Sequence, residues 1–179
     1  MRVTISSSSS ESINNQYKES AIKVCNYLAE NGWDLNWGSG SISIMGICYD
    51  EFSKSKRSLY GYTSSKYADD IENLPNANHK IFDTTFDLKK NIFNDADLVL
   101  MLPGGTGTIS EFFAYLEEIR SNNVNIPLVL YNENHHFDTT LALIDDLIDR
   151  DFNRNNIYEY FKVANTFEEF KTIVNNIND

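Results

Sequence analysis

Two kinds of hydrophobic pattern alternate along the chain. Short continuous apolar runs predict strands, and stretches with apolar residues three and four positions apart predict helices. Six runs predict strands, and residues 80–83 are expected to form a short extended segment. The predicted strands cover residues 2–6, 33–37, 58–63, 96–102, 126–132 and 160–165. The run at 96–102 shows little alternation, which favours a strand buried on both faces of a sheet.

The first helical pattern follows a polar, serine-rich loop. Tyr17, Ala21 and Leu28 lie on one face of this predicted helix, and Gly32 ends it. Further helices are predicted after the loop 38–46 and at residues 84–95, 107–123, 139–152 and 166–177, with a polar connection at 64–79. Strands that alternate with helices favour parallel pairing through right-handed crossovers. The sequence therefore predicts an α/β fold with a doubly wound parallel sheet, a Rossmann-like three-layer sandwich, with residues 1–179 as a single domain.

Composition narrows the possible partners. The chain has 26 acidic and 15 basic residues, a formal net charge of -11 and a pI near 4.6. Such a field repels phosphate backbones and anionic lipid, so neither nucleic acid nor a membrane is an expected partner. Cys25 and Cys48 lie in apolar stretches, and the N-terminus lacks the hydrophobic region of a signal peptide. We therefore expect a cytoplasmic protein with reduced thiols.

The stretch Pro103 to Glu111, PGGTGTISE, lies between a predicted strand and a predicted helix. Its glycines let the backbone approach a ligand closely, and the free N–H groups of the helix start favour an anion. The expected phosphate cradle consists of Gly104, Gly105, Thr106, Gly107 and Thr108. The threonines are also suited simply to cap the helix. No lysine follows the glycines, so the stretch is not a P-loop of nucleoside triphosphatases.

Glu111 lies about one helical turn beyond Thr108, close enough to face the ribose side of a ligand bound by the cradle. A glutamate at a helix start is also favoured by the macrodipole alone. The pattern predicts a core face formed by Phe112, Phe113, Leu116 and Ile119. It places Glu111, Tyr115 and Glu118 on a different stripe, which is expected to face a cleft or a partner subunit.

A second glycine-containing turn, GSGSISIMG at residues 38–46, follows the second predicted strand. Gly38, Ser39 and Gly40 are expected to border the same crevice at the carboxyl ends of the strands. The turn is not in the place that a Rossmann dinucleotide site requires, so NAD is only weakly supported. Ser8, after the first strand, either lines this crevice or ends the strand.

Both glycine-containing motifs resemble those of a known protein family. PGGTGTISE resembles the PGGxGTxxE motif of the LONELY GUY (LOG) family, the cytokinin riboside 5′-monophosphate phosphoribohydrolases. GSGSISIMG resembles that family's GGGxxGLMG turn, with Ser39 at its middle glycine. Similarity extends to FDTTFDLKK, IPLVLYNENHHFD and VANTFEEF. The resemblance implies hydrolysis of a nucleoside monophosphate such as AMP to a free base and ribose 5-phosphate, by a homodimer that needs no cofactor and no metal.

The same resemblance assigns roles to individual residues. Glu111 matches the family's acid/base glutamate, and Gly38, Ser39 and Gly40 match the rim opposite the phosphate cradle. In the family's T-D-T-M-x-x-R-K segment, Asp83 and Lys89 match, but the arginine position is Leu88. Two other functions stay open: a non-catalytic nucleotide-binding or sensing protein, and a deoxyribosyl transferase that works through a covalent intermediate.

The remaining candidates have plainer interpretations. His79 is expected in a polar connection, and His135 and His136 in a loop after a strand. Without cysteines or carboxylates at metal-ligand spacing, we expect these histidines to be solvated. The basic group of Lys54, Lys56 and Arg57 is expected to be a solvated helix end.

Overall fold

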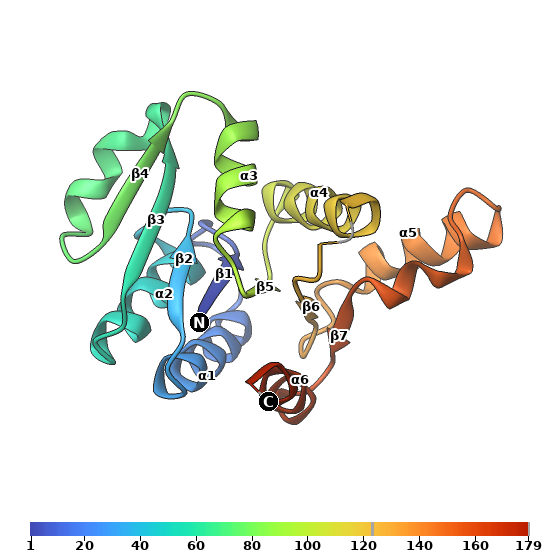
Figure 1. The fold of residues 1–179 in the computed structure, drawn as a ribbon. Helices are drawn as coiled ribbons and strands as arrows, with labels where there is room; N and C mark the ends of the chain where they lie inside the picture. Colours follow the sequence, from blue (N-terminus) through green and yellow to red (C-terminus); the bar gives the residue numbers. More distant parts are fainter. Residues whose placement is uncertain (123, 179) are drawn as a thin grey trace.

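The computed structural model describes residues 1–122 and 124–178. Its seven strands form one parallel sheet in the order β4-β3-β2-β1-β5-β6-β7 (Figure 1). The strands are β1 (Arg2–Ser6), β2 (Asp34–Trp37), β3 (Leu59–Ser64), β4 (Asn78–Phe82), β5 (Leu98–Met101), β6 (Leu128–Tyr131) and β7 (Lys162–Ala164). The chain winds outward from β1 to β4, returns to β5 beside β1, and then winds the other way. The predicted doubly wound α/β fold is confirmed.

Helices cover both faces of this sheet (Figure 1). They are α1 (Asn15–Glu30), α2 (Ser43–Lys54), α3 (Thr85–Asn94), α4 (Thr106–Asn122), α5 (Asp138–Asp149) and α6 (Phe167–Asn178), with 3-10 helices η1 (Ser65–Asn73) and η2 (Asn155–Glu159). Buried side chains of α1, α2 and α6 share one hydrophobic cluster, and those of α3, α4 and α5 share another. The molecule therefore has three layers, with the sheet in the middle.

Local sequence explains where these elements begin and how they pack. The side chain of Asn14 accepts a hydrogen bond from the Gln16 amide at the start of α1, and Thr84 does the same for Asp87 at the start of α3. All four residues of β5 are buried, and so are all four of β6. That burial on both faces is why the sequence of β5 shows little alternation.

The sequence-based prediction differs from the structure in three places. Residues 65–73 form η1 and not an irregular connection, and β4 begins at Asn78, two residues before the expected extended segment. The third difference concerns Tyr115, which is 2% exposed and stacks on Phe93 in the core with ring centroids 5.0 Å apart. The expectation that Tyr115 faces a cleft or a partner was wrong, because α4 packs a broader apolar face than its periodicity indicated.

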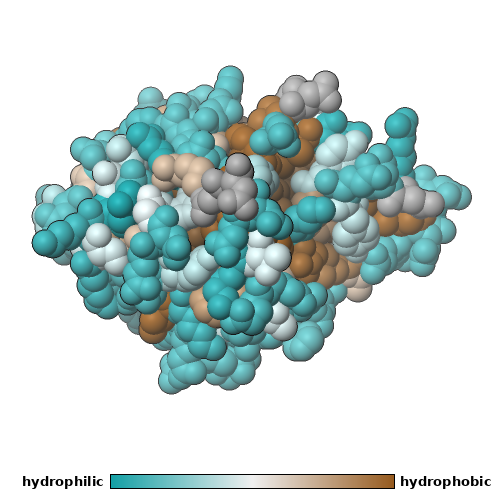
Figure 2. Space-filling view, turned by 60° about the horizontal axis from the view of Figure 1, so that its bottom comes forward, coloured by the Kyte–Doolittle hydropathy of each residue, from teal (hydrophilic) through white to brown (hydrophobic). Residues whose placement is uncertain are grey.

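The surface reflects the acidic, polar composition. Figure 2 shows one face of the molecule, on which hydrophilic residues predominate and hydrophobic residues show through in the middle of the view. Of the helices in residues 1–122 and 124–178, none combines the length and the apolar character that crossing a membrane requires.

Candidate functional site

A cavity of about 520 Å³ opens at the carboxyl ends of β1, β2 and β3, between the first turns of α2 and α4 and beside α3. It lies where the strand order reverses, between β1 and β5, which is the position that ligands prefer in this type of sheet. Hydroxyl side chains are frequent in its lining: Thr4, Ser6, Ser7, Ser9, Ser39, Ser41, Thr63, Ser64, Thr85 and Thr108. A hydroxyl-rich cavity of this size suits a polar small molecule.

Glu111 lines the cavity from the second turn of α4. The hydroxyl of Ser6, at the end of β1, donates a hydrogen bond to its carboxylate. Burial raises the pKa of Glu111 above its ordinary value, while the Ser6 hydrogen bond and the positive charge of Lys89 act in the opposite direction. A carboxyl group in this environment is suited to exchange a proton with a ligand.

Charge inside the cavity is sparse. Among the described residues that line it, Lys89 is the single cation, and Glu111 and Asp70 are the carboxylates. The Nζ of Lys89 donates to Ser110 Oγ at 2.7 Å, which links α3 to the start of α4. Attraction for an anion must therefore come mainly from backbone amides and hydroxyls rather than from side-chain cations.

The turn before α4 has one crowded and two open glycines. A Cβ at Gly104 would overlap Thr108 Oγ1 and lie 2.7 Å from Thr108 Cβ, so this position requires glycine. A Cβ at Gly105 or Gly107 would meet no heavy atom within 4 Å. Gly105 and Gly107 thus face open space, where the backbone of the helix start is accessible to an anion.

His136 supports this turn from behind. Its Nε2 lies 3.1 Å from the Gly104 amide nitrogen and 2.8 Å from the Gly104 carbonyl oxygen, so it accepts from the first or donates to the second according to its tautomer. Its ring also packs edge-on against Tyr17, with centroids 5.5 Å apart. The expectation of a solvated His136 was therefore wrong.

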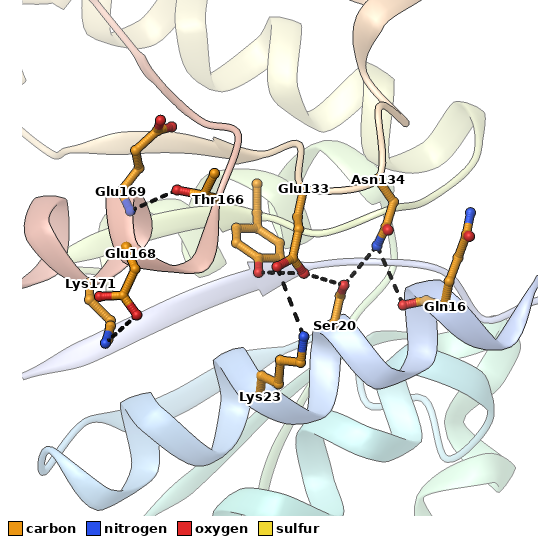
Figure 3. A network of polar contacts seen from close by, with 10 residues as sticks. Gln16, Ser20, Lys23, Glu133, Asn134, Thr166, Glu168, Glu169 and Lys171 are labelled. Carbon is orange, nitrogen blue, oxygen red and sulfur yellow. Dashed lines mark hydrogen bonds and ion pairs between the residues drawn. The ribbon is translucent and has the colours of Figure 1, made fainter.

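A polar network holds the loop that carries His136. Ser20 of α1 donates to Glu133 at 2.6 Å and accepts from Asn134 at 2.7 Å, and Lys23 lies 3.9 Å from Glu133 (Figure 3). These contacts join α1 to the chain just after β6. His136 lies two residues beyond Asn134, so the network anchors to α1 the segment that carries it.

The second glycine turn forms the opposite rim of the cavity. Gly38, Ser39 and Gly40 line it together with Met45 of α2. Added Cβ atoms at Gly38 and Gly40 would lie 2.6 Å and 2.8 Å from atoms of the Met45 side chain, so these glycines make room for that methionine. Ser39 has a left-handed backbone with φ of 54°, a conformation that favours glycine.

The predicted site residues fall into two groups. Seven of them line the cavity: Gly38, Ser39, Gly40, Lys89, Gly107, Thr108 and Glu111. Gly104, Gly105 and Thr106 form the adjoining turn and helix start without being part of the lining. Ser8 is buried beside the cavity, where its amide donates to the Pro103 carbonyl at 3.0 Å. Asp83 is exposed and lies outside the lining.

Several cavity residues were not foreseen from the sequence. Tyr67 and Asp70 reach the cavity from η1, which the sequence did not predict. His79, which lies outside the cavity lining, is in β4 rather than in a polar connection and bonds to Ser39, so the expectation of a solvated His79 was also wrong. The signal for Ser6 was its place as the last residue of a first strand, where a side chain faces the crevice.

Other polar groups have structural roles. Arg57 donates to the backbone carbonyls of Gly32 and Trp33 and pairs with Asp34 at 2.8 Å, so it anchors the chain before β2 and is not a solvated helix end. Within residues 1–122 and 124–178, no group of three or more His, Cys, Asp or Glu side chains could hold a metal ion.

Comparison with protein families shows which family the chain belongs to. A family model described as "Possible lysine decarboxylase" matches residues 45–174. The match includes all of the stretch 103–111 with Glu111, and the last two residues of the turn at 38–46. The chain belongs to this family. It is the LOG family that the sequence motifs resemble.

Curated members with sequence similarity carry one name. A Mycobacterium tuberculosis cytokinin riboside 5′-monophosphate phosphoribohydrolase is 26% identical over 166 residues, which cover 90% of this chain and 81% of the relative. An Arabidopsis thaliana protein with the same enzyme name is 27% identical over 155 residues, covering 84% of this chain and 71% of the relative. These identities support common ancestry within the LOG family.

Solved structures with the same fold have other names. The molybdenum cofactor binding protein from Rippkaea orientalis superposes with a TM-score of 0.69 at 17% identity, covering 99% of this chain and 97% of that one. The molybdenum cofactor carrier protein from Chlamydomonas reinhardtii gives a TM-score of 0.70 at 13% identity, covering 98% and 96%. At such identities the likeness concerns the fold alone.

Proposed function

We propose that this protein is a nucleoside 5′-monophosphate phosphoribohydrolase. It would cleave the N-glycosidic bond of a substrate such as AMP with water, giving a free base and ribose 5-phosphate. The observation that carries the proposal is Glu111, a carboxyl group with a raised pKa that lines a hydroxyl-rich cavity beside a glycine-rich helix start. The name shared by the curated relatives supports the same reaction.

Glu111 would act at the anomeric carbon. Departure of the base leaves positive charge on the ribose ring, and a nearby carboxylate stabilises that charge. The attacking water gives up a proton as it bonds to this carbon, and the leaving base takes one up, so the protons balance. The Ser6 hydrogen bond holds the Glu111 carboxylate in one orientation for this role.

The 5′-phosphate would bind at the start of α4. The backbone amides of a first helical turn lack partners within the helix, and the helix dipole favours an anion. Ser7 supports this placement, because its Oγ is buried in the cavity lining with no hydrogen-bond partner in the described part of the protein. A ligand oxygen would satisfy that hydroxyl.

One observation favours a second function. Leu88 lines the cavity at the position where the family has its arginine, and leucine offers no charge to a phosphate or to a transition state. With the cradle present and that charge absent, the protein would bind nucleotides without hydrolysing them. The molybdenum cofactor binding and carrier proteins show that this fold also occurs in proteins named for binding.

We further propose a homodimer, as the family resemblance implies. A second cavity, of about 430 Å³, lies between α4, α5 and η2, and its lining includes exposed Phe152 together with Leu116 and Leu147. The lining also contains polar and charged side chains such as Glu117, Arg120 and Arg154, so it offers a second copy a mixed contact, and the dimer rests mainly on the family resemblance. The argument from Tyr115 no longer supports the dimer, because that side chain is in the core.

Two measurements on one sample test the function. Calorimetry with AMP measures binding, and chromatography of the same mixture measures released adenine. Adenine release that Glu111→Gln abolishes would support the hydrolase. AMP binding without adenine release would favour the non-catalytic function, and an absence of AMP binding would contradict both.

A further inference from the structure

His79 makes two hydrogen bonds, one to Ser39 in the cavity lining and one to the end of η1, an element whose Tyr67 and Asp70 line the cavity. Its Nδ1 lies 3.0 Å from Ser39 Oγ, in the turn between β2 and α2. Its Nε2 lies 3.2 Å from the carbonyl oxygen of Leu74, the residue that caps the C-terminal end of η1. One side chain on the edge strand β4 therefore joins the glycine turn to η1.

The partners fix the direction of both hydrogen bonds. A carbonyl oxygen only accepts, so Nε2–H of His79 donates to Leu74. In the neutral ring Nδ1 then lacks a hydrogen, and it accepts from the hydroxyl of Ser39. The Ser39 side chain is thereby held against β4 at the edge of the cavity.

The surroundings are shaped to admit this pair. A Cβ at Gly61 of β3 would overlap both Ser39 Oγ and His79 Nδ1, so the pair needs glycine at that place. The His79 ring also packs on Trp37, with centroids 5.9 Å apart, and the indole N–H of Trp37 donates to the Gly40 carbonyl at 3.2 Å. Ser39 itself is 2% exposed.

Ser39 is one of two serines in this turn with a left-handed backbone, the other being Ser43, and it is the one whose side chain contacts His79. Its φ of 54° is a conformation that a residue with a Cβ adopts at a cost, whereas glycine adopts it freely. A hydrogen bond from its side chain to a fixed partner offsets this cost. His79 is that partner, and without it the turn would relax toward an ordinary backbone.

We propose that His79 is a positioning residue for the candidate site, which holds the strained turn at Ser39 in the shape that forms one rim of the cavity and anchors η1 on the other side. Its effect on nucleotide affinity rests on the proposed function. Its effect on the shape of the ligand-free turn does not.

The experiment compares five variants by two measurements: His79→Ala, His79→Asn, Ser39→Gly, the double variant Ser39→Gly/His79→Ala, and His135→Ala. Hydrogen exchange of the ligand-free protein follows residues 38–46 and 64–74, and calorimetry follows AMP. His135→Ala is the matched control, because that histidine is exposed and its contact is a local one, to Asp138 three residues later, outside both followed segments.

We expect His79→Ala to speed exchange in both segments and to weaken AMP binding about five- to tenfold, the effect of losing one or two ordinary hydrogen bonds. Ser39→Gly should leave exchange at 38–46 slow, because glycine adopts this backbone freely. The double variant should match Ser39→Gly in both exchange at 38–46 and AMP affinity, because with glycine there the turn needs no partner. His79→Asn should protect 38–46 alone, since its amide oxygen replaces only Nδ1.

Rescue of the His79→Ala effects by Ser39→Gly in the double variant would distinguish a positioning role of His79 from a general contribution to stability. A double variant as impaired as His79→Ala would overturn the proposal, and so would unchanged exchange at 38–46 in His79→Ala. If His79→Ala does not fold, His79→Asn and Ser39→Gly still decide the role of the Ser39 hydrogen bond. If the unchanged protein does not bind AMP, the proposed function fails, while the exchange data still decide the role of His79.

Discussion

Substitution of Leu88 by arginine should raise the rate of adenine release from AMP. Leu88 lies in α3, lines the cavity and packs partly against the core cluster that contains Ile92. If an arginine there stabilises charge in the transition state, one such preorganised group contributes about 2–4 kcal/mol. That free energy corresponds to a gain of roughly thirty- to a thousandfold in rate.

The cost to folding should be small. Leu88 is only partly buried, and the methylene stem of an arginine can cover the same apolar surface while its guanidinium reaches the cavity. We expect a loss of about 1 kcal/mol, which lowers the melting temperature by about 2–4 °C in a chain of this length. Lys89 already points to Ser110 from the next position, so the new charge would not duplicate an existing contact.

The assay measures adenine by chromatography and the melting temperature of the same preparation. Leu88→Gln controls for length and polarity without charge, and Leu143→Arg controls for a new arginine on another helix, where the leucine is 47% exposed. A Leu88→Arg protein that binds AMP and melts as expected, yet releases adenine no faster than Leu88→Gln, would refute the idea of a latent hydrolase.

Four other outcomes are expected. Glu111→Gln should lower any hydrolysis at least a hundredfold while AMP affinity, measured by calorimetry, changes only a few-fold. Burial raises the pKa of Glu111 in the folded state, so ionisation of this carboxyl group lowers the stability of the fold as the pH rises through its folded-state pKa. Glu111→Gln should therefore have a higher melting temperature than the unchanged protein at pH 8. This difference should shrink toward acid pH. Gly104→Ala should lower stability by about 1–3 kcal/mol in denaturant unfolding, because its Cβ would overlap Thr108, whereas Gly105→Ala should not. Light scattering should report a mass near twice 20.5 kDa, and a monomer at micromolar concentration would contradict the dimer.

The fold was predictable because its signals are local and repeated. Buried strands such as β5 and β6 stand out as uniform apolar runs, and each helix shows its own periodicity. The sequence did not predict η1 because its nine residues are mostly polar and bury no side chain, so they show no hydrophobic pattern. Tyr115 was misplaced for the opposite reason: its ring is apolar enough for the core, where it stacks on Phe93.

Residues of the candidate site were predictable from the sequence only where they belong to a recognisable motif. Glu111 and the two glycine turns belong to recognisable sequences, and the parallel topology brings both turns to one cavity. His79 and His136 carry no such motif. Their roles depend on contacts across 40 and 32 positions of sequence, to Ser39 and Gly104, which periodicity and composition cannot reveal.

Binding and chemistry depend on different parts of this cavity. In the proposed function, nucleotide binding would use the helix start at Gly105 and Gly107 and a row of hydroxyls, which need no side-chain charge to attract a phosphate. Cleavage of the glycosidic bond requires Glu111 in its hydrogen bond with Ser6 and, in the family pattern, an arginine where this chain has Leu88. Substitution of one residue thus removes charge from the reaction while leaving the phosphate cradle unchanged. Under this proposal a chain with this combination would still hold a nucleotide where hydrolysis is slow, and for that reason affinity and turnover must be measured separately.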